Sequence, residues 1–239
     1  MTSDGEPRPK DGAACFLQVF ENPLMAVHYH DGPRQFVPGL EALHRMTGIL
    51  LAERVPSDAR ILVLGAGGGL ELRALAESFG GWRFVGVDPA AQMLKLAEAT
   101  LGGDAARVDF VQGYIDDAPQ GPFDAAVCLL TLHFLDEAER LRTAREICRR
   151  LKPDAPFVAA HGSFPQEGPE KALWLSRYAA YAIASGADPE QVAKARDAVD
   201  AMGMMLSPQR DEAVLRQAGF SDVSLFYAAF TWRGWVGYA

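Results

Sequence analysis

A turn rich in glycine carries the clearest chemical signal in this sequence. Four glycines lie in the five positions of Gly65–Gly69, directly after the apolar run Ile61–Leu64 and directly before a helical pattern that begins at Leu70. Because glycine lacks a Cβ atom, this backbone can take positive φ angles and approach a bound group closely, and the start of the helix offers unpaired N–H groups. A second apolar run, Arg83–Val87, ends in Asp88, whose carboxylate can accept hydrogen bonds from both hydroxyls of a ribose. The pattern predicts a ligand built on an adenine nucleoside and carrying an anionic or zwitterionic group.

Simpler explanations of these residues remain open. The glycines can serve a tight structural turn, and Asp88 can be a solvated N-cap of the helix that starts near Ala90. A dinucleotide enzyme is a further alternative. Its G-x-G-x-x-G motif requires a small residue where this sequence has Leu70, so that the helix can pack closely on the strand, and this requirement is not met.

The composition restricts the classes of protein to be considered. The chain has 239 residues, 49% of them hydrophobic, which is enough for one large α/β domain with an elaboration. A formal net charge of −8 and a pI near 5.1 argue against a nucleic-acid surface, and neither a bilayer-spanning stretch nor a signal-peptide pattern is present in the sequence. Cys15, Cys128 and Cys148 are widely spaced and odd in number, which favours a reducing cytoplasm over a disulfide or zinc framework. No metal site is expected, because only His28 and His30 share an element.

Apolar patterns with the periods of a strand and of a helix alternate through the middle of the chain. They predict, in order, strand 60–64, helix 69–79, strand 83–87, helix 90–99, strand 107–112, strand 123–129, helix 136–151 and strand 156–161. Such an alternation is typical of a parallel sheet with helices on both faces. The tail from Asp222 to Ala239 predicts two more strands, joined as a hairpin with its break at Arg233-Gly234. The predicted fold class is therefore α/β, a Rossmann-like, doubly wound, seven-stranded sheet with a C-terminal antiparallel hairpin and an inserted helical pair.

Capping signals divide the rest of the chain. Asp188 and Ser207 are each an N-cap residue followed by a proline in the first helical position, and Gly219 ends the last helix. The predicted organisation is a disordered tail (1–14), an N-terminal helical lid (15–58), a Rossmann-like core (59–162), a helical insertion (163–206), and a last helix with the hairpin that completes the core (207–239).

Six segments follow one another in a set order: LGAGGG (64–69), VDPAAQML (87–94), FVQGYIDD (110–117), FDAAVCLLTLHFL (123–135), LKPDAPFV (151–158) and LRQAGF (215–220). Together they resemble the class I S-adenosylmethionine (SAM) dependent methyltransferases over residues 60–239. VPGL (37–40), TLHFL (131–135) and the ending LFYAAFTWRGWVGYA look like the carboxy-SAM synthase branch of that family and its small-molecule methyltransferase relatives.

The resemblance implies cofactor-binding residues one by one. They are the glycine-loop trio, the ribose acid with its neighbour, the adenine pair and the end of the fourth strand: Gly65, Ala66, Gly67, Asp88, Pro89, Tyr114, Ile115 and Leu129. This sequence departs from the family at Tyr114 and Leu129, where aspartate and asparagine are usual, and at Val63, where many methyltransferases have an acid. Met93 is expected to cover one face of the adenine. Arg34 is expected to reach the methionine carboxylate of SAM.

His133, just past the fourth strand, is the candidate catalytic residue, because a histidine near the methyl acceptor can act as a general base. Methyl transfer from a sulfonium depends mainly on aligning the acceptor and excluding water, so a base is needed only where the acceptor must lose a proton. Aromatic residues of the insertion, Trp174, Tyr178 and Tyr181, are candidates to contact an acceptor or to pack on the sheet or on a partner subunit.

The sequence therefore predicts a cytoplasmic SAM-dependent methyltransferase that acts on a small molecule and yields S-adenosylhomocysteine (SAH). No membrane or direct nucleic-acid partner is expected, and the exposed insertion is compatible with a homodimer. One alternative is a carboxy-SAM synthase-like enzyme of tRNA wobble-uridine modification, in which an arginine near Arg196 would meet the extra carboxylate. A degenerate SAM-binding protein is the other alternative, motivated by Val63, Tyr114 and Leu129.

Overall fold

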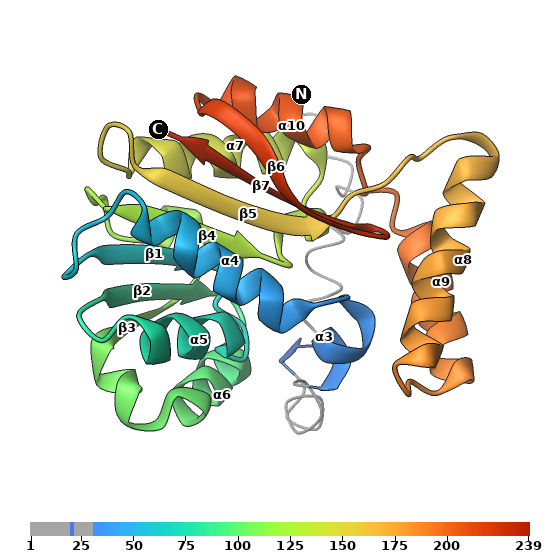
Figure 1. Cartoon of the computed structure of the whole chain (residues 1–239), viewed down its shortest axis with the longest axis horizontal. Helices are drawn as coiled ribbons and strands as arrows, with labels where there is room; N and C mark the ends of the chain where they lie inside the picture. The colour runs from blue at the N-terminus through green and yellow to red at the C-terminus, as the bar shows by residue number, and fades with distance from the viewer. Residues whose placement is uncertain (1–19, 22–30) are drawn as a thin grey trace, which may run out of the picture.

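The computed structural model describes residues 20–21 and 31–239 of the chain, and the predictions made for residues 1–14, His28 and His30 lie outside them. One sheet of seven strands has the order β3-β2-β1-β4-β5-β7-β6. The strands are β1 (Arg60–Leu64), β2 (Arg83–Asp88), β3 (Val108–Gln112), β4 (Ala125–Leu129), β5 (Pro156–Gly162), β6 (Ser221–Ala229) and β7 (Trp232–Tyr238). Strands β1 to β5 are parallel, whereas β7 runs antiparallel to both β5 and β6 (Figure 1). The predicted α/β fold with a C-terminal antiparallel hairpin is confirmed.

Helices lie on both faces of this sheet and at one end of the molecule (Figure 1). The helices of the described residues are α3 (Asp31–Phe36), α4 (Leu40–Ala52), α5 (Leu70–Ser78), α6 (Ala91–Leu101), α7 (Glu137–Arg149), α8 (Gly168–Ala184), α9 (Pro189–Ala201) and α10 (Pro208–Ala218). Along β1, Ile61 and Val63 belong to the apolar core that includes α4 and α5, whereas Leu62 and Leu64 belong to the core that includes α7 and α10. Since alternate residues of a strand point to opposite faces, the continuous apolar sequence of β1 reflects burial on both sides.

The predicted helix ends agree with the structure. Asp188 caps α9 by accepting a hydrogen bond from the backbone N–H of Gln191 at 3.0 Å, and Ser207 caps α10 by accepting one from Arg210. Gly219 ends α10 in the left-handed conformation, with φ 114°. Each signal involves residues at most three positions apart, so it needs no tertiary information.

The hairpin turn was placed wrongly at Arg233-Gly234. The chain turns at Phe230 and Thr231, between β6 and β7, and Phe230 has φ 52°. Gly234 lies inside β7, where a Cβ atom would be 3.0 Å from the ring of Phe226 and 3.2 Å from the Cβ atom of Ala160. This glycine therefore allows close packing between neighbouring strands and does not form a turn.

The insertion forms a helical pair at one end of the molecule, with α8 and α9 side by side (Figure 1). Tyr178 of α8 packs against Phe36 of α3 with ring centroids 5.2 Å apart, and Tyr181 contacts the hairpin residue Phe230 at 6.1 Å. The guanidinium of Arg233 lies over the ring of Trp174. The aromatic residues of the insertion thus pack against other parts of the same chain. In the described residues, no helix has the length and apolarity needed to span a bilayer.

Candidate functional site

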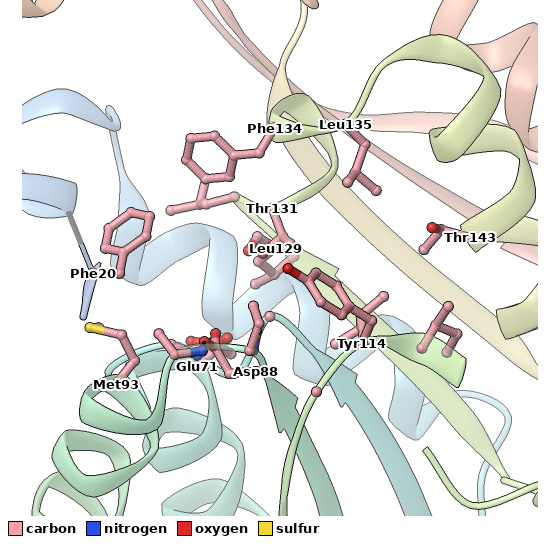
Figure 2. A pocket seen from close by; sticks show the side chains of 18 of the residues that line it. Phe20, Glu71, Asp88, Met93, Tyr114, Leu129, Thr131, Phe134, Leu135 and Thr143 are labelled. Carbon is pink, nitrogen blue, oxygen red and sulfur yellow. Dashed lines mark hydrogen bonds between the residues drawn. The ribbon is translucent and has the colours of Figure 1, made fainter. Parts of the chain in front are cut away.

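A cavity of about 830 Å³ lies at the carboxyl edge of the parallel strands. Strands β1 and β4 are neighbours in the sheet, but the chain continues from β1 to β2 on one side and from β4 to β5 on the other. Ligands of open α/β sheets bind just beyond the strand ends at such a reversal of strand order. The lining includes residues from the ends of these strands, from α4, α5, α6 and α7, and from the loops after β2, β3 and β4 (Figure 2).

The glycine loop is held against β2 and approaches the loop after β4 closely. The amides of Gly65 and Ala66 both donate to the carbonyl of Val87, at 2.8 and 3.0 Å. Gly65 has φ 75°, and a Cβ atom on it would lie 2.0 Å from Oγ1 of Thr131. Position 65 therefore requires glycine for its backbone angle and for its lack of a side chain. Gly65 and Gly67, two of the residues expected to bind the cofactor, line the cavity, whereas Ala66 is fully buried and does not line it.

Asp88 connects the end of β2 to this loop. Its Oδ2 accepts a hydrogen bond from the amide of Gly67 at 2.9 Å, and its Oδ1 accepts one from the amide of Ala90 at 2.9 Å. Burial raises the pKa of the Asp88 carboxyl, and the two amide hydrogen bonds oppose this shift. Because each carboxylate oxygen has a further lone pair, Asp88 can orient the loop and still accept hydrogen bonds from the hydroxyl groups of a ligand in the cavity. The N-cap position of α6 is Ala90 itself, so the alternative that Asp88 caps this helix does not hold.

The residues predicted to surround an adenine share the cavity with Asp88. Met93 of α6 and Ile115 of the 3₁₀ turn Ile115–Asp117 are buried, whereas Tyr114 is 47% exposed. Figure 2 shows Met93 and Tyr114 flanking Asp88. The other predicted cofactor-binding residues in the lining are Pro89 and Leu129. These residues belong to one cavity lining, and Tyr114 is the most exposed of them.

Two predicted residues are not brought into the cavity lining. Arg34 is an exposed residue of α3. His133 is buried, with its Nδ1 accepting a hydrogen bond from the amide of Gly162 at 3.4 Å and its ring packed edge-on against Trp232. Burial lowers the pKa of His133 well below its usual range, so the imidazole is neutral. Its neighbour in the sequence, Phe134, lines the cavity in its place.

Glu71 is a lining residue that the sequence patterns did not single out. It lies in the first turn of α5 and only 8% of its surface is exposed. Burial raises the pKa of Glu71 to about 8, against an opposing hydrogen bond from its own backbone amide, and the nearby charge of Asp88 adds a smaller upward shift. One signal could have found it, because Glu71 occupies the same buried helix face as Leu72 and Leu75. An acid on an apolar stripe is a candidate functional group.

His44 of α4 is the second lining residue that was missed. Burial, reinforced by the charges of Arg34 and Arg73, lowers the pKa of His44 to about 4. The imidazole is therefore neutral at pH 7 and can accept or donate a hydrogen bond in the cavity.

An apolar wall lies across the cavity from Asp88. Phe20 and Phe134 contact each other edge to face, with ring centroids 5.9 Å apart. Figure 2 shows Phe134 above Thr131 and Phe20 to the left of Thr131. Other apolar side chains of the lining are those of Leu40, Leu130, Leu135 and Met204. Leu130 has φ 56°, a conformation that is strained for leucine, at the point where the chain leaves β4.

The rim of the cavity is acidic. Its carboxylates belong to Asp116, Asp117, Asp136 and Glu139. Arg142, the single arginine or lysine in the described lining, is held by Asp116 at 2.9 Å and by Glu139 at 3.1 Å. The cavity therefore favours a ligand with net positive charge. Within residues 20–21 and 31–239, no group of three or more His, Cys, Asp or Glu side chains is arranged to hold a metal ion.

Comparisons with known proteins agree with this geometry. The family described as "Methyltransferase domain" matches residues 61–154. A carboxy-S-adenosyl-L-methionine synthase of Wolinella succinogenes is 26% identical over 157 residues, which are 66% of this chain and 63% of that protein. This alignment therefore spans less than two thirds of the relative's own length.

Two solved structures share the fold. PigF with SAH matches with a TM-score of 0.65 and 19% identity, over 94% of this chain and 62% of that one. Human N-acetylserotonin methyltransferase in complex with SAM matches with a TM-score of 0.56 and 16% identity, over 91% and 59% of the two chains. The chain therefore has the fold of these methyltransferases, and its residues 61–154 match the family described as "Methyltransferase domain".

Proposed function

We propose that this protein is a SAM-dependent enzyme that transfers a methyl group to a small-molecule acceptor. One observation carries the proposal: a single cavity joins the glycine loop and Asp88 to an apolar wall that contains Phe20 and Phe134. Asp88, Met93 and the 3₁₀ turn after β3 suit the nucleoside part of SAM, and the wall suits an acceptor.

The residues present fit SAM, because Asp88 holds the glycine loop through the amide of Gly67 and keeps hydrogen-bonding capacity toward the cavity. Bound SAM would supply an activated methyl carbon and depart as neutral SAH. The protein's part is to hold the acceptor in line with that carbon and to exclude water, and alignment of this kind can lower a barrier by about 7–11 kcal/mol. The apolar wall excludes water, and neutral His44 can hold an acceptor hydroxyl or amine by a hydrogen bond.

Replacing Asp88 by asparagine is expected to weaken SAM binding about 10- to 100-fold. The change removes the negative charge that strengthens hydrogen bonds to the ribose, and a hydrogen bond to a charged group contributes about 1.5–3 kcal/mol. Isothermal titration calorimetry with SAM measures the effect. Asp109→Asn, on the exposed side of β3, is the matched control and should bind SAM normally. A dissociation constant within twofold of the wild type in Asp88→Asn would remove Asp88 from the site.

A carboxy-SAM synthase is the second candidate, favoured by the Wolinella succinogenes relative. A ligand with an additional carboxylate needs a positive group, and the only arginine or lysine in the described lining, Arg142, is already bound to Asp116 and Glu139. Arg196 of the insertion pairs with the adjacent Asp197, is exposed, and is not part of the cavity lining. The acidic rim therefore supports SAM over carboxy-SAM as the ligand.

We expect purified protein to bind SAM at least tenfold more tightly than carboxy-SAM. The physical reason is the surplus of carboxylates in the lining, which repels a second negative group on the ligand. Competition calorimetry at low and high salt measures both affinities, and mass spectrometry of the protein under native conditions identifies any ligand that co-purifies. Equal or tighter binding of carboxy-SAM would favour the synthase, and binding of neither compound would favour a degenerate SAM-fold protein.

Cytoplasmic location and a homodimer belong to the same proposal. Cys128 and Cys148 are free thiols, in keeping with a reducing compartment. Leu173 and Ile183 of α8 are 48% and 45% exposed, which offers apolar surface for a second copy. A measurement of the molecular mass in solution tests whether the protein is a homodimer.

A further inference from the structure

The helix after the glycine loop places a carboxyl group inside the cavity. Glu71 follows the first residue of α5 and is 8% exposed. It lines the cavity together with Asp88, and Figure 2 shows the two acidic side chains close together beneath Leu129 and Thr131. A carboxyl group with this degree of burial is normally paired with a positive group or held by several hydrogen bonds.

No positive side chain of the described protein serves Glu71 in this way. None of the ion pairs formed by residues 20–21 and 31–239 includes it, and its carboxyl interacts with its own backbone amide. Of the titratable groups around it, Asp88 on β2 has the same sign of charge, and His44 on α4 is neutral. Cys128 on β4 is an un-ionised thiol, because burial raises its pKa, and Arg73 faces outward in an ion pair within α5.

We propose that Glu71 binds the α-ammonium group of the methionine part of SAM. This inference rests on the proposed function. With the ribose at Asp88, the amino-acid part of the ligand continues along the glycine loop, and Glu71 is the buried acid at the far end of that loop. Strand β1 offers no acid there, since its last residues, Val63 and Leu64, are aliphatic.

The ionisation of Glu71 then depends on the ligand. In the free protein, burial raises the pKa of Glu71 to about 8, so the carboxyl is protonated at pH 6.5. The α-ammonium of the ligand is charged at that pH. When it enters the cavity, Glu71 releases its proton to solvent, and an N–H group of the ammonium donates a hydrogen bond to the resulting carboxylate. Fixing the amino-acid part in this way positions the sulfur atom relative to the acceptor.

Three ligands and one isosteric variant test the proposal. Calorimetry at pH 6.5 compares the wild-type chain with Glu71→Gln for SAM, for SAH, and for 5′-methylthioadenosine, which lacks the amino-acid part. We expect the variant to bind SAM and SAH about tenfold more weakly or worse, by similar factors, and 5′-methylthioadenosine within twofold of the wild type. Glu98→Gln, an exposed acid of α6 outside the cavity, should bind all three normally.

Proton release gives a second measurement. Titrations of SAM at pH 6.5 in two buffers with different ionisation enthalpies should show about one proton released per SAM bound by the wild type and by Glu98→Gln, but none by Glu71→Gln.

Each remaining outcome overturns the assignment. An equal loss for all three ligands would mean that Glu71 supports the loop or the nucleoside. A much larger loss for SAM than for SAH would place Glu71 at the sulfonium. Unchanged affinities in Glu71→Gln would remove it from binding altogether. If the wild type bound none of the three ligands, the proposed function itself would fail, and that result is distinct from the others.

Discussion

Replacing Gly65 by alanine is expected to weaken SAM binding more than about 100-fold, since two penalties of order 1–3 kcal/mol each combine. Gly65 has φ 75°, a conformation unfavourable for residues with a Cβ atom. The new methyl group would lie 2.0 Å from Oγ1 and 2.7 Å from Cβ of Thr131, so the glycine loop or the loop after β4 must move. Both loops line the cavity, and either movement displaces groups that contact the cofactor.

Binding of SAM by calorimetry and unfolding by urea together measure this effect. Gly80→Ala is the matched control, because Gly80 is exposed and a Cβ atom there meets nothing within 4 Å. The control should bind SAM as the wild type does, and Gly65→Ala should fold but bind weakly. If Gly65→Ala bound SAM with wild-type affinity, the cofactor would have to lie away from this loop.

Glu71→Gln is expected to stabilise the ligand-free protein by about 3 kcal/mol at pH 7. The pKa of Glu71 is about 8 in the folded protein and 4.5 as its ordinary value. A raised pKa of the folded state means that the contribution of Glu71 to stability is full below pH 4.5. It is lost progressively as the pH rises to about 8, at about 1.36 kcal/mol per pH unit. Glutamine does not ionise, so the variant escapes this loss.

Urea unfolding at pH 5 and at pH 7 measures the free energy of unfolding of both proteins. The variant should gain little at pH 5 and about 3 kcal/mol at pH 7, whereas Glu98→Gln should show no gain that depends on pH. An advantage of Glu71→Gln that is the same at both pH values would show that burial does not hold the acid in its protonated form. A protein that is more stable but binds SAM more weakly would mark Glu71 as retained for function at the expense of stability.

Patterns in the sequence were sufficient to predict that the glycine loop and Asp88 lie together in the site. Gly65–Gly69 and Asp88 could be placed together because each follows an apolar strand, and the carboxyl ends of neighbouring parallel strands meet at one edge of a sheet. The N-caps at Asp188 and Ser207 could also be predicted from the sequence, since a cap depends on residues three positions apart. Met93, Tyr114 and the other adenine-side residues were placed by the order of family motifs, and the structure brings them into the same cavity.

Tertiary structure alone decided the direction and environment of single side chains. His133 is covered by the hairpin residue Trp232, about a hundred positions away, and this contact leaves no trace in the local sequence. Gly234 packs closely against the ring of Phe226 and against Ala160 of β5, although its neighbourhood in the sequence resembles a turn.

Glu71 also shows the difference between what local sequence predicts and what tertiary structure determines. From the sequence, Glu71 is an acid on the leucine-rich face of α5, which marks it as a candidate functional residue but does not show whether its carboxyl group meets solvent or a ligand. Only the packing of α4, β2 and β4 around it removes the water and leaves a carboxyl group beside Asp88. Local sequence determined the order of the strands and helices, the helix caps and the glycine loop, because those features depend on neighbouring residues, but it did not locate the turn between β6 and β7. The long-range packing of the chain determined which side chains are desolvated inside the cavity, and desolvation is what sets their charge and their chemistry.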